Sequence, residues 1–296
     1  MSVTRDSAPP ADPRAQVAAV PRWYHCIEVA PGVVTPGWFD LRPALERMPW
    51  PEVRGRRCLD VGTADGALAF ELERRGAAEV VAVDLAAHDD WDLEPRVAED
   101  VIRYLQLTTG ASPRAGFQVA HRLLGSRVRF EALSVYELEP GRLGRFDVVV
   151  CGSLLLHLRD PLRALAAIAS VCRGELLCSN QIDLLRSVGP RRRPLVRLDG
   201  TAGLTQWWIP NAAAHGQMLR AGGFTVVRES GLYSVPFGGA HPPRARTLRM
   251  AALSMTERVL TGHRGVPHVA ALAVPAAPAW PATPAGGSVP AAPSGR

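Results

Sequence analysis

The chain has 296 residues, 34 basic against 28 acidic side chains and a formal net charge of +6, and every basic residue is arginine. The absence of lysine excludes functions that need a lysine amine: pyridoxal or substrate Schiff bases, P-loop phosphate binding and a kinase-type ATP site. A hydrophobic fraction of 47% is enough for a substantial core, so the composition favours a globular enzyme.

Cysteine usage and the chain ends suggest where the protein works. Five cysteines with no C-x-x-C pair favour reduced thiols over a disulfide framework or a zinc site, so we expect no bound metal. No apolar stretch reaches the roughly 18 residues of a membrane helix, and the N-terminus has no apolar signal core. We therefore expect a cytoplasmic protein with no membrane association.

The two ends of the chain are expected to be disordered. Residues 1–20 and roughly 265–296 are rich in proline, alanine and glycine and show no hydrophobic period, and the C-terminal extension is expected to cover 241–296. Such a composition cannot offset the conformational entropy of ordering. We expect a disordered N-terminal tail and a mostly disordered C-terminal extension.

Between these ends, strand-like and helix-like patterns alternate. Strands are expected at 56–61, 79–84, 127–132, 146–152, 175–179 and 223–230. Helices are expected at 66–75, 95–107, 160–172 and 211–221, with Asp160 and Asn211 as N-caps, Pro161 in the first turn and Gly222 at a C-terminus. This alternation predicts an α/β fold with a Rossmann-like, doubly wound and mostly parallel sheet, whose ligands bind at the carboxyl ends of the strands.

The turn after the first expected strand, LDVGTADG (59–66), has the pattern of a cofactor loop. It opens into a helix, and Asp84 ends the next strand about 20 residues on, where an acid holds ribose hydroxyls. A dinucleotide would bring its pyrophosphate against Asp60 and Asp65. Like charges about 4 Å apart repel by roughly 4 kcal/mol. The loop favours S-adenosylmethionine, which has no phosphate; a dinucleotide-dependent oxidoreductase or a non-catalytic S-adenosylmethionine-binding module are the alternatives.

Several longer segments carry a family resemblance. They are WYHCIEVAPGVVTPGWFDLRP (23–43), LDVGTADG (59–66), ERRGAAEVVAVDL (73–85), LLGSRVRFEALSVYEL (123–138) and FDVVVCGSLLLHLRDPLRAL (146–165). Together they resemble class I S-adenosylmethionine-dependent methyltransferases, in particular the bacterial branch described as wobble-uridine tRNA methyltransferases, which is related to the tRNA uridine carboxymethyltransferases. The resemblance implies an S-adenosylmethionine-binding methyltransferase domain over 51–240. Residues 21–50 would form an arm that contributes to acceptor binding.

The resemblance also implies which residues bind the cofactor. The expected set is Asp60, Gly62, Thr63, Asp65, Gly66, Asp84, Leu85, Ser134, Val135 and Cys151. Within this set, the glycine turn would contact the methionine end, Asp84 the ribose hydroxyls, and Leu85 the adenine. The segment 151–157 would form the floor of the reaction site. There the chain departs from the branch, because Leu156 stands where a tyrosine is common.

His157 is the expected catalytic residue, as a general base. Its unperturbed pKa of about 6.5 suits deprotonation of a hydroxyl near neutral pH. The alternative is that His157 only packs the turn that precedes Asp160. The chain has no Pro-Cys dipeptide, so Cys151 is expected to be a buried strand thiol, and it lacks the Asp/Asn-Pro-Pro-aromatic turn of base-amine methylation. An oxygen acceptor is favoured, on a tRNA uridine or on a specialised metabolite.

Flanking segments offer acceptor contacts, each with a structural alternative. The aromatic residues from Trp23 to Phe39 suit stacking on a flat ring or packing of the arm on the sheet. The arginines at 191–193 and Arg197 suit phosphate binding or a solvated loop. The acids at 89, 90 and 92 are interpreted as solvated charge.

Overall fold

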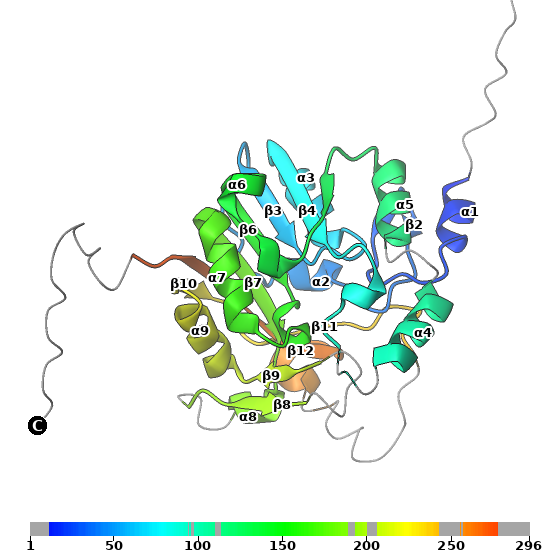
Figure 1. Ribbon diagram of the computed structural model, residues 1–296. Helices are drawn as coiled ribbons and strands as arrows, with labels where there is room; N and C mark the ends of the chain where they lie inside the picture. Colours follow the sequence, from blue (N-terminus) through cyan, green and yellow to red (C-terminus); the bar gives the residue numbers. More distant parts are fainter. Residues whose placement is uncertain are drawn as a thin grey trace, which may run out of the picture.

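The protein is described by a computed structural model that covers residues 12–93, 95, 98–109, 114–188, 193–199, 206–242, 255 and 257–277. Within these residues a single large sheet forms the centre (Figure 1). Its strands run in the order β10 (Phe224–Glu229), β12 (Val266–Pro275), β7 (Cys172–Gln181), β6 (Phe146–Gly152), β3 (Arg57–Val61), β4 (Glu79–Asp84) and β5 (Arg129–Ala132). A short strand, β11 (Tyr233–Val235), pairs with β12.

The pairing of the strands is mostly parallel. The strands β3, β4, β5, β6 and β7 are parallel to one another. Strand β12 is antiparallel to both β7 and β10. The expected Rossmann-like, doubly wound α/β fold is therefore present. The inserted antiparallel strand distinguishes it from a six-stranded dinucleotide-binding sheet, whose strands are parallel in the order 3-2-1-4-5-6.

Helices cover both faces of the sheet, and side chains alternate between them along each strand. One face packs against α3 (Ala67–Arg74), α5 (Ala115–Leu124), α2 (Arg42–Leu45), α1 (Pro13–Ala18) and the hairpin of β1 (Glu28–Ala30) and β2 (Val33–Val34). The other packs against α6 (Pro140–Leu143), α7 (Pro161–Val171) and α9 (Ala212–Ala221); Figure 1 shows α7 and α9 side by side. Along β3, Cys58 belongs to the first core and Leu59 to the second.

The remaining elements lie at the loops that follow the strands. Helix α4 (Ala98–Thr109) and the 3-10 turn η1 (His88–Asp90) follow β4, the turn η2 (Val135–Glu137) follows β5, and η3 (Leu155–His157) follows β6. Helix α8 (Leu184–Val188), β8 (Val196–Leu198) and β9 (Trp208–Pro210) form an insertion between β7 and α9, grouped at one end of the sheet in Figure 1.

The local signals for strands and helix ends are confirmed. Each expected strand is present within a few residues of its expected limits. The Asp160 carboxylate accepts a hydrogen bond from Arg163 N at 3.0 Å, and the Asn211 side chain accepts one from Ala214 N at 2.8 Å. Both side chains cap their helices as predicted.

The expectation that both ends of the chain are disordered is wrong for two segments. Residues 13–18 form α1, which begins at Pro13 and is capped by the Asp12 carboxylate on Arg14 N at 3.0 Å. Residues 266–275 form β12, which lies in the sheet between β10 and β7 rather than in a loose extension. The composition gave the wrong prediction because β12 is stabilised by contacts with distant parts of the chain. It forms backbone hydrogen bonds with a strand on each side and is buried on both faces, and neither property can be read from the local sequence.

Helix α5 was not expected from the sequence. Gly116 lies in its first turn, and a Cβ on this glycine would come 2.5 Å from the Asp65 carboxylate. The helix can therefore approach the cofactor turn only because residue 116 has no side chain. Glycine lowers intrinsic helix propensity, so the feature that allows this packing also hides the helix from a sequence pattern.

Candidate functional site

The turn between β3 and α3 has a buried carboxylate at its base. Asp60 is 1% exposed, and its Oδ2 accepts a hydrogen bond from Thr63 Oγ1 at 2.7 Å. Its other oxygen, Oδ1, is buried without a hydrogen-bond partner among the described residues. Such an oxygen can accept a hydrogen bond from a ligand or water, which would lower the cost of burying the carboxylate. Gly62 and Gly66 keep the turn open with positive φ angles of 76° and 90°.

Asp84, at the end of β4, holds this turn from the neighbouring strand. Its Oδ2 accepts from Ala64 N at 2.7 Å, and its Oδ1 accepts from Leu85 N at 2.8 Å. Each carboxylate oxygen has a second lone pair, so a ribose hydroxyl can still donate to it. Ala64 adopts a positive φ of 48°, which glycine would adopt at lower cost.

The electrostatics of the turn favour a cation. Burial raises the pKa of Asp60 to about 7 and the pKa of Asp65 to about 6, and burial also raises the pKa of Asp84. Several carboxylates gathered in a buried turn repel one another when ionised. A positively charged ligand relieves this repulsion, whereas a pyrophosphate would add to it.

These carboxylates predict a pH dependence of S-adenosylmethionine binding. The cationic ligand binds the ionised form of Asp60, whose pKa is about 7 in the free protein, so a proton must leave before binding at lower pH. We expect the affinity to fall several-fold between pH 7 and pH 6, measured by calorimetry. The Asp60→Asn variant should bind weakly at both pH values and lack this slope. A wild-type affinity that is constant over this range would contradict the prediction.

Asp65 has a role that the sequence did not indicate. Its Oδ2 accepts hydrogen bonds from the backbone N–H groups of Tyr24 and His25, the latter at 2.9 Å. Asp65 is itself buried, so these charge-assisted bonds fasten the N-terminal arm to the cofactor turn. The contact of Asp65 with the cofactor stays a prediction.

Within the arm, Trp23 is structural. It is 1% exposed, and its indole N–H donates to Val17 O at 3.0 Å. Tyr24 and Phe39 pack edge to face with ring centroids 5.2 Å apart. Packing of the arm, one of the two alternatives for this segment, therefore accounts for these rings.

The loops after β4 and β5 frame the expected adenine position. Leu85 is half-buried, Val135 is buried, and Ser134 caps η2 by accepting from Tyr136 N at 3.3 Å. Leu133 N donates to Asp84 O at 2.9 Å, which ties the two loops together. The structure thus brings Leu85, Ser134 and Val135 to the same edge of the sheet as Asp84.

The loop after β4 also contains a junction that the sequence interpretation missed. The Asp92 carboxylate accepts from Tyr136 Oη at 2.8 Å and from Arg159 N at 2.7 Å, and Asp92 O accepts from Trp207 Nε1 at 2.6 Å. The interpretation of Asp92 as solvated charge is wrong. This residue joins the loops after β4, β5 and β6 to the insertion, all of which are far apart in sequence.

The end of β6 and the segment that follows it contain the expected reaction-site residues. Cys151 is fully buried, and its pKa is raised well above the usual thiol value by the hydrogen bond with Cys178 and by burial. It is the buried strand thiol that was expected, rather than a nucleophile. Leu156 is buried, and its carbonyl accepts from Trp207 N at 2.7 Å. His157 ends η3 and is half-buried at the start of the α7 loop.

Two of the three arginines that the structure describes in the insertion, Arg186 and Arg197, are paired with acids. Arg197 donates to Asp199 at 3.1 Å, and Arg186 donates to Asp183 at 2.5 Å. Arg159 lies over the Trp207 ring, with its guanidinium carbon 4.9 Å from the centroid. Arg191 and Arg192, part of the expected basic run, lie outside the described residues.

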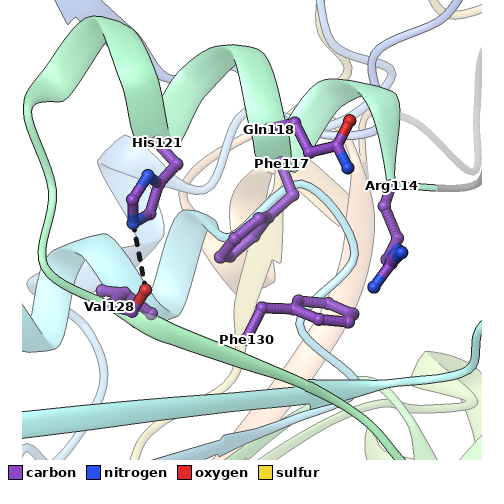
Figure 2. Close-up of a pocket in the computed structure, with 6 residues that line it drawn as sticks. All are labelled: Arg114, Phe117, Gln118, His121, Val128 and Phe130. Atoms are coloured by element: carbon purple, nitrogen blue, oxygen red, sulfur yellow. Dashed lines mark hydrogen bonds between the residues drawn. The ribbon is translucent and has the colours of Figure 1, made fainter.

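A separate cavity of about 330 Å³ lies between α5 and β5 (Figure 2). Phe117 and Phe130 pack edge to face across it at 5.1 Å, and His121 Nε2 lies 3.0 Å from Val128 O. Arg114 and Gln118 complete its lining. None of the expected cofactor residues lines it. Among the residues that the structure describes, no helix is long and apolar enough to span a membrane and no metal-ligand cluster forms.

Comparison with known proteins identifies relatives of the chain. Residues 39–229 match the family described as a methyltransferase domain. A ubiquinone biosynthesis O-methyltransferase of Neisseria meningitidis (serogroup C) is 30% identical over 124 residues, which cover 42% of this chain and 42% of the relative. A tRNA U34 carboxymethyltransferase of Pseudomonas fluorescens (strain Pf0-1) is 27% identical over 194 residues, which cover 64% of this chain and 50% of the relative.

The chain spans half or less of the length of these curated relatives. Among solved structures, the Burkholderia thailandensis 1,6-didemethyltoxoflavin-N1-methyltransferase, with bound 1,6-didemethyltoxoflavin and S-adenosylhomocysteine, is similar at 20% identity and a TM-score of 0.48. That match covers 80% of this chain and 78% of the other.

Proposed function

The chain belongs to the class I S-adenosylmethionine-dependent methyltransferases, and we propose that it transfers a methyl group to a hydroxyl oxygen of a small molecule. The observation that carries the proposal is the buried carboxylate turn. It offers an unpartnered Asp60 oxygen and an Asp84 carboxylate with free lone pairs, as a cationic nucleoside cofactor requires. Bound S-adenosylmethionine would supply a methyl group already activated on sulfur. A dinucleotide-dependent oxidoreductase fits neither the family nor the charge of this turn.

The protein's own contribution is alignment and one proton transfer. Asp60 with the Gly62 turn would hold the methionine end, Asp84 the ribose, and the loops at Leu85 and Ser134 the adenine. Displacement at a methyl group depends mainly on the alignment of the acceptor oxygen with it. His157, half-buried after β6, would accept the proton of the acceptor hydroxyl. The described cysteines are free thiols, which fits a cytoplasmic setting.

A small molecule is favoured over tRNA by the charge of the insertion beside the site. Two of the three arginines that the structure describes there are paired with acids, Arg186 with Asp183 and Arg197 with Asp199 and Asp183, whereas Arg193 has no ion pair among the described residues. Arginines that bind RNA backbone need their guanidinium donors for phosphate oxygens. Leu156 also fills its position with a buried aliphatic side chain, so it has no hydroxyl for a uridine. The tRNA uridine is the second candidate, because the Pseudomonas relative is named for it.

One comparison tests both acceptors. Nucleosides and metabolites from wild-type cells and from cells that lack the gene would be analysed by tandem mass spectrometry. We expect one methylated metabolite to disappear and its unmethylated form to accumulate, with the wobble uridine of tRNA unchanged. A change in the wobble uridine alone would replace the small-molecule proposal with the tRNA one.

For the base, we predict that His157→Ala slows methyl transfer by about a hundredfold with little change in cofactor affinity, since general-base catalysis is worth about that much. Initial rates with tritiated S-adenosylmethionine and calorimetry with S-adenosylhomocysteine would measure both. His121→Ala, on α5, is the histidine control. An unaffected rate would mean that His157 only packs the turn.

A further inference from the structure

A serine and a histidine, neither singled out by the sequence, meet at the carboxyl end of β6. Ser153 follows the strand, and its Oγ lies 2.7 Å from His268 Nε2 on β12. The other ring nitrogen, His268 Nδ1, lies 2.7 Å from Val266 O. A carbonyl oxygen only accepts, so Nδ1 carries the proton of the neutral ring and Nε2 accepts. The Ser153 hydroxyl therefore donates to His268.

The surroundings of His268 hold it in this state. The ring is buried, and burial lowers its pKa to about 4, so it is neutral at physiological pH. Tyr233 stacks on it with ring centroids 5.9 Å apart, and the Tyr233 hydroxyl is itself hydrogen-bonded to Ser179 Oγ at 2.7 Å. Because the Ser153 hydroxyl donates its hydrogen bond to His268, Ser153 Oγ presents only lone pairs to other groups.

The backbone of Ser153 is strained in a way that points to function. Its φ is +54°, in the left-handed region that glycine adopts at lower cost than serine. Ser153 N donates to Ser179 O at 2.8 Å, which fixes this conformation. A strained backbone conformation persists only where the surrounding structure enforces it, and residues strained in this way cluster at active sites and ligand-binding sites.

Ser153 also lies next to the cofactor turn. Its neighbour Leu154 packs against Gly62, where an added Cβ would come 3.0 Å from Leu154 Cδ1. On the other side, a Cβ on Gly152 would come 2.4 Å from Leu68 Cδ1, at the start of α3. Ser153 is half-buried between them, within the segment expected to form the floor of the reaction site.

We propose that Ser153 Oγ accepts a hydrogen bond from an O–H or N–H group of the methyl acceptor, beside the atom that is methylated, and that His268 is the positioning residue that orients Ser153. The pair then selects acceptors that carry such a donor, because an acceptor without one would leave the serine oxygen unpaired. This inference rests on the proposed function and adds a specificity contact to it.

The test uses Ser153→Gly, because glycine removes the hydroxyl and suits the backbone. The full chain would be incubated with tritiated S-adenosylmethionine and a dilution series of the methanol-soluble extract of cells that lack the gene. We expect Ser153→Gly to melt at or above the wild-type temperature and to bind S-adenosylhomocysteine within about twofold of wild type. The rate at high extract dilution should fall about tenfold or more, the usual range for loss of a polar substrate contact.

The histidine variants separate positioning from packing. His268→Ala should lose rate as Ser153→Gly does, whereas His268→Gln should recover part of it, because the amide oxygen can accept from Ser153. Ser170→Ala, a serine on α7 bonded to Ala167 O at 2.7 Å, is the control and should be unchanged.

The outcomes are distinguishable. If wild-type protein labels the extract and Ser153→Gly labels it equally fast, the role of Ser153 is overturned and the proposed function stands. Equal losses in S-adenosylhomocysteine affinity and rate would also overturn it, because the serine would then serve the cofactor. If wild-type protein labels nothing in the extract, the small-molecule function falls and this contact falls with it.

Discussion

Replacement of Asp84 by alanine is expected to abolish cofactor binding. The carboxylate would accept hydrogen bonds from ribose hydroxyls, and charge-assisted bonds contribute about 1.5–3 kcal/mol each. The same side chain holds Ala64 N and Leu85 N, so its loss also loosens the turn. We expect the affinity for S-adenosylhomocysteine to fall by at least about a hundredfold in calorimetry.

The control for this variant is Asp147→Ala. Asp147 lies on β6 and pairs with Arg173 at 2.7 Å, away from the cofactor turn, so its loss should leave the affinity unchanged. Thermal melting would show that both variants fold. An Asp84→Ala protein that melts cooperatively and keeps wild-type affinity would refute the assignment of the ribose contact.

The parallel part of the fold was predictable because its signals are local. Strands β3, β4 and β6 are short apolar runs bounded by turn residues, and they are buried on both faces, as such runs require. The cofactor turn was predictable for the same reason, since Asp60, Gly62 and Asp84 occur at a fixed spacing along two strands. Side-chain caps such as Asp160 also depend only on neighbours in sequence.

The contacts that were not predictable join residues far apart in the chain. Ser153 meets His268 across 115 residues, and Asp92 meets Trp207 across 115 as well. No spacing rule connects such residues, because their proximity follows from the order of strands in the sheet. The position of His268 depends on β12. The composition of this part of the chain predicted disorder, so no strand was expected there. The error in the fold therefore also hid part of the site.

The position of β12 between two other strands leads to the strongest expected effect on folding. Ala271 is fully buried and pairs with Cys178 of β7 on one side and Glu229 of β10 on the other. Ala271→Asp would bury a carboxylate that has no hydrogen-bond or ion-pair partner, at a cost above about 4 kcal/mol. This is a large part of the roughly 5–15 kcal/mol by which a folded domain is stable. We expect loss of cooperative thermal unfolding. Ala276→Asp makes the same change at an exposed position beyond β12 and should melt like wild type. Cooperative melting of Ala271→Asp at the wild-type temperature would show that β12 is dispensable to the sheet.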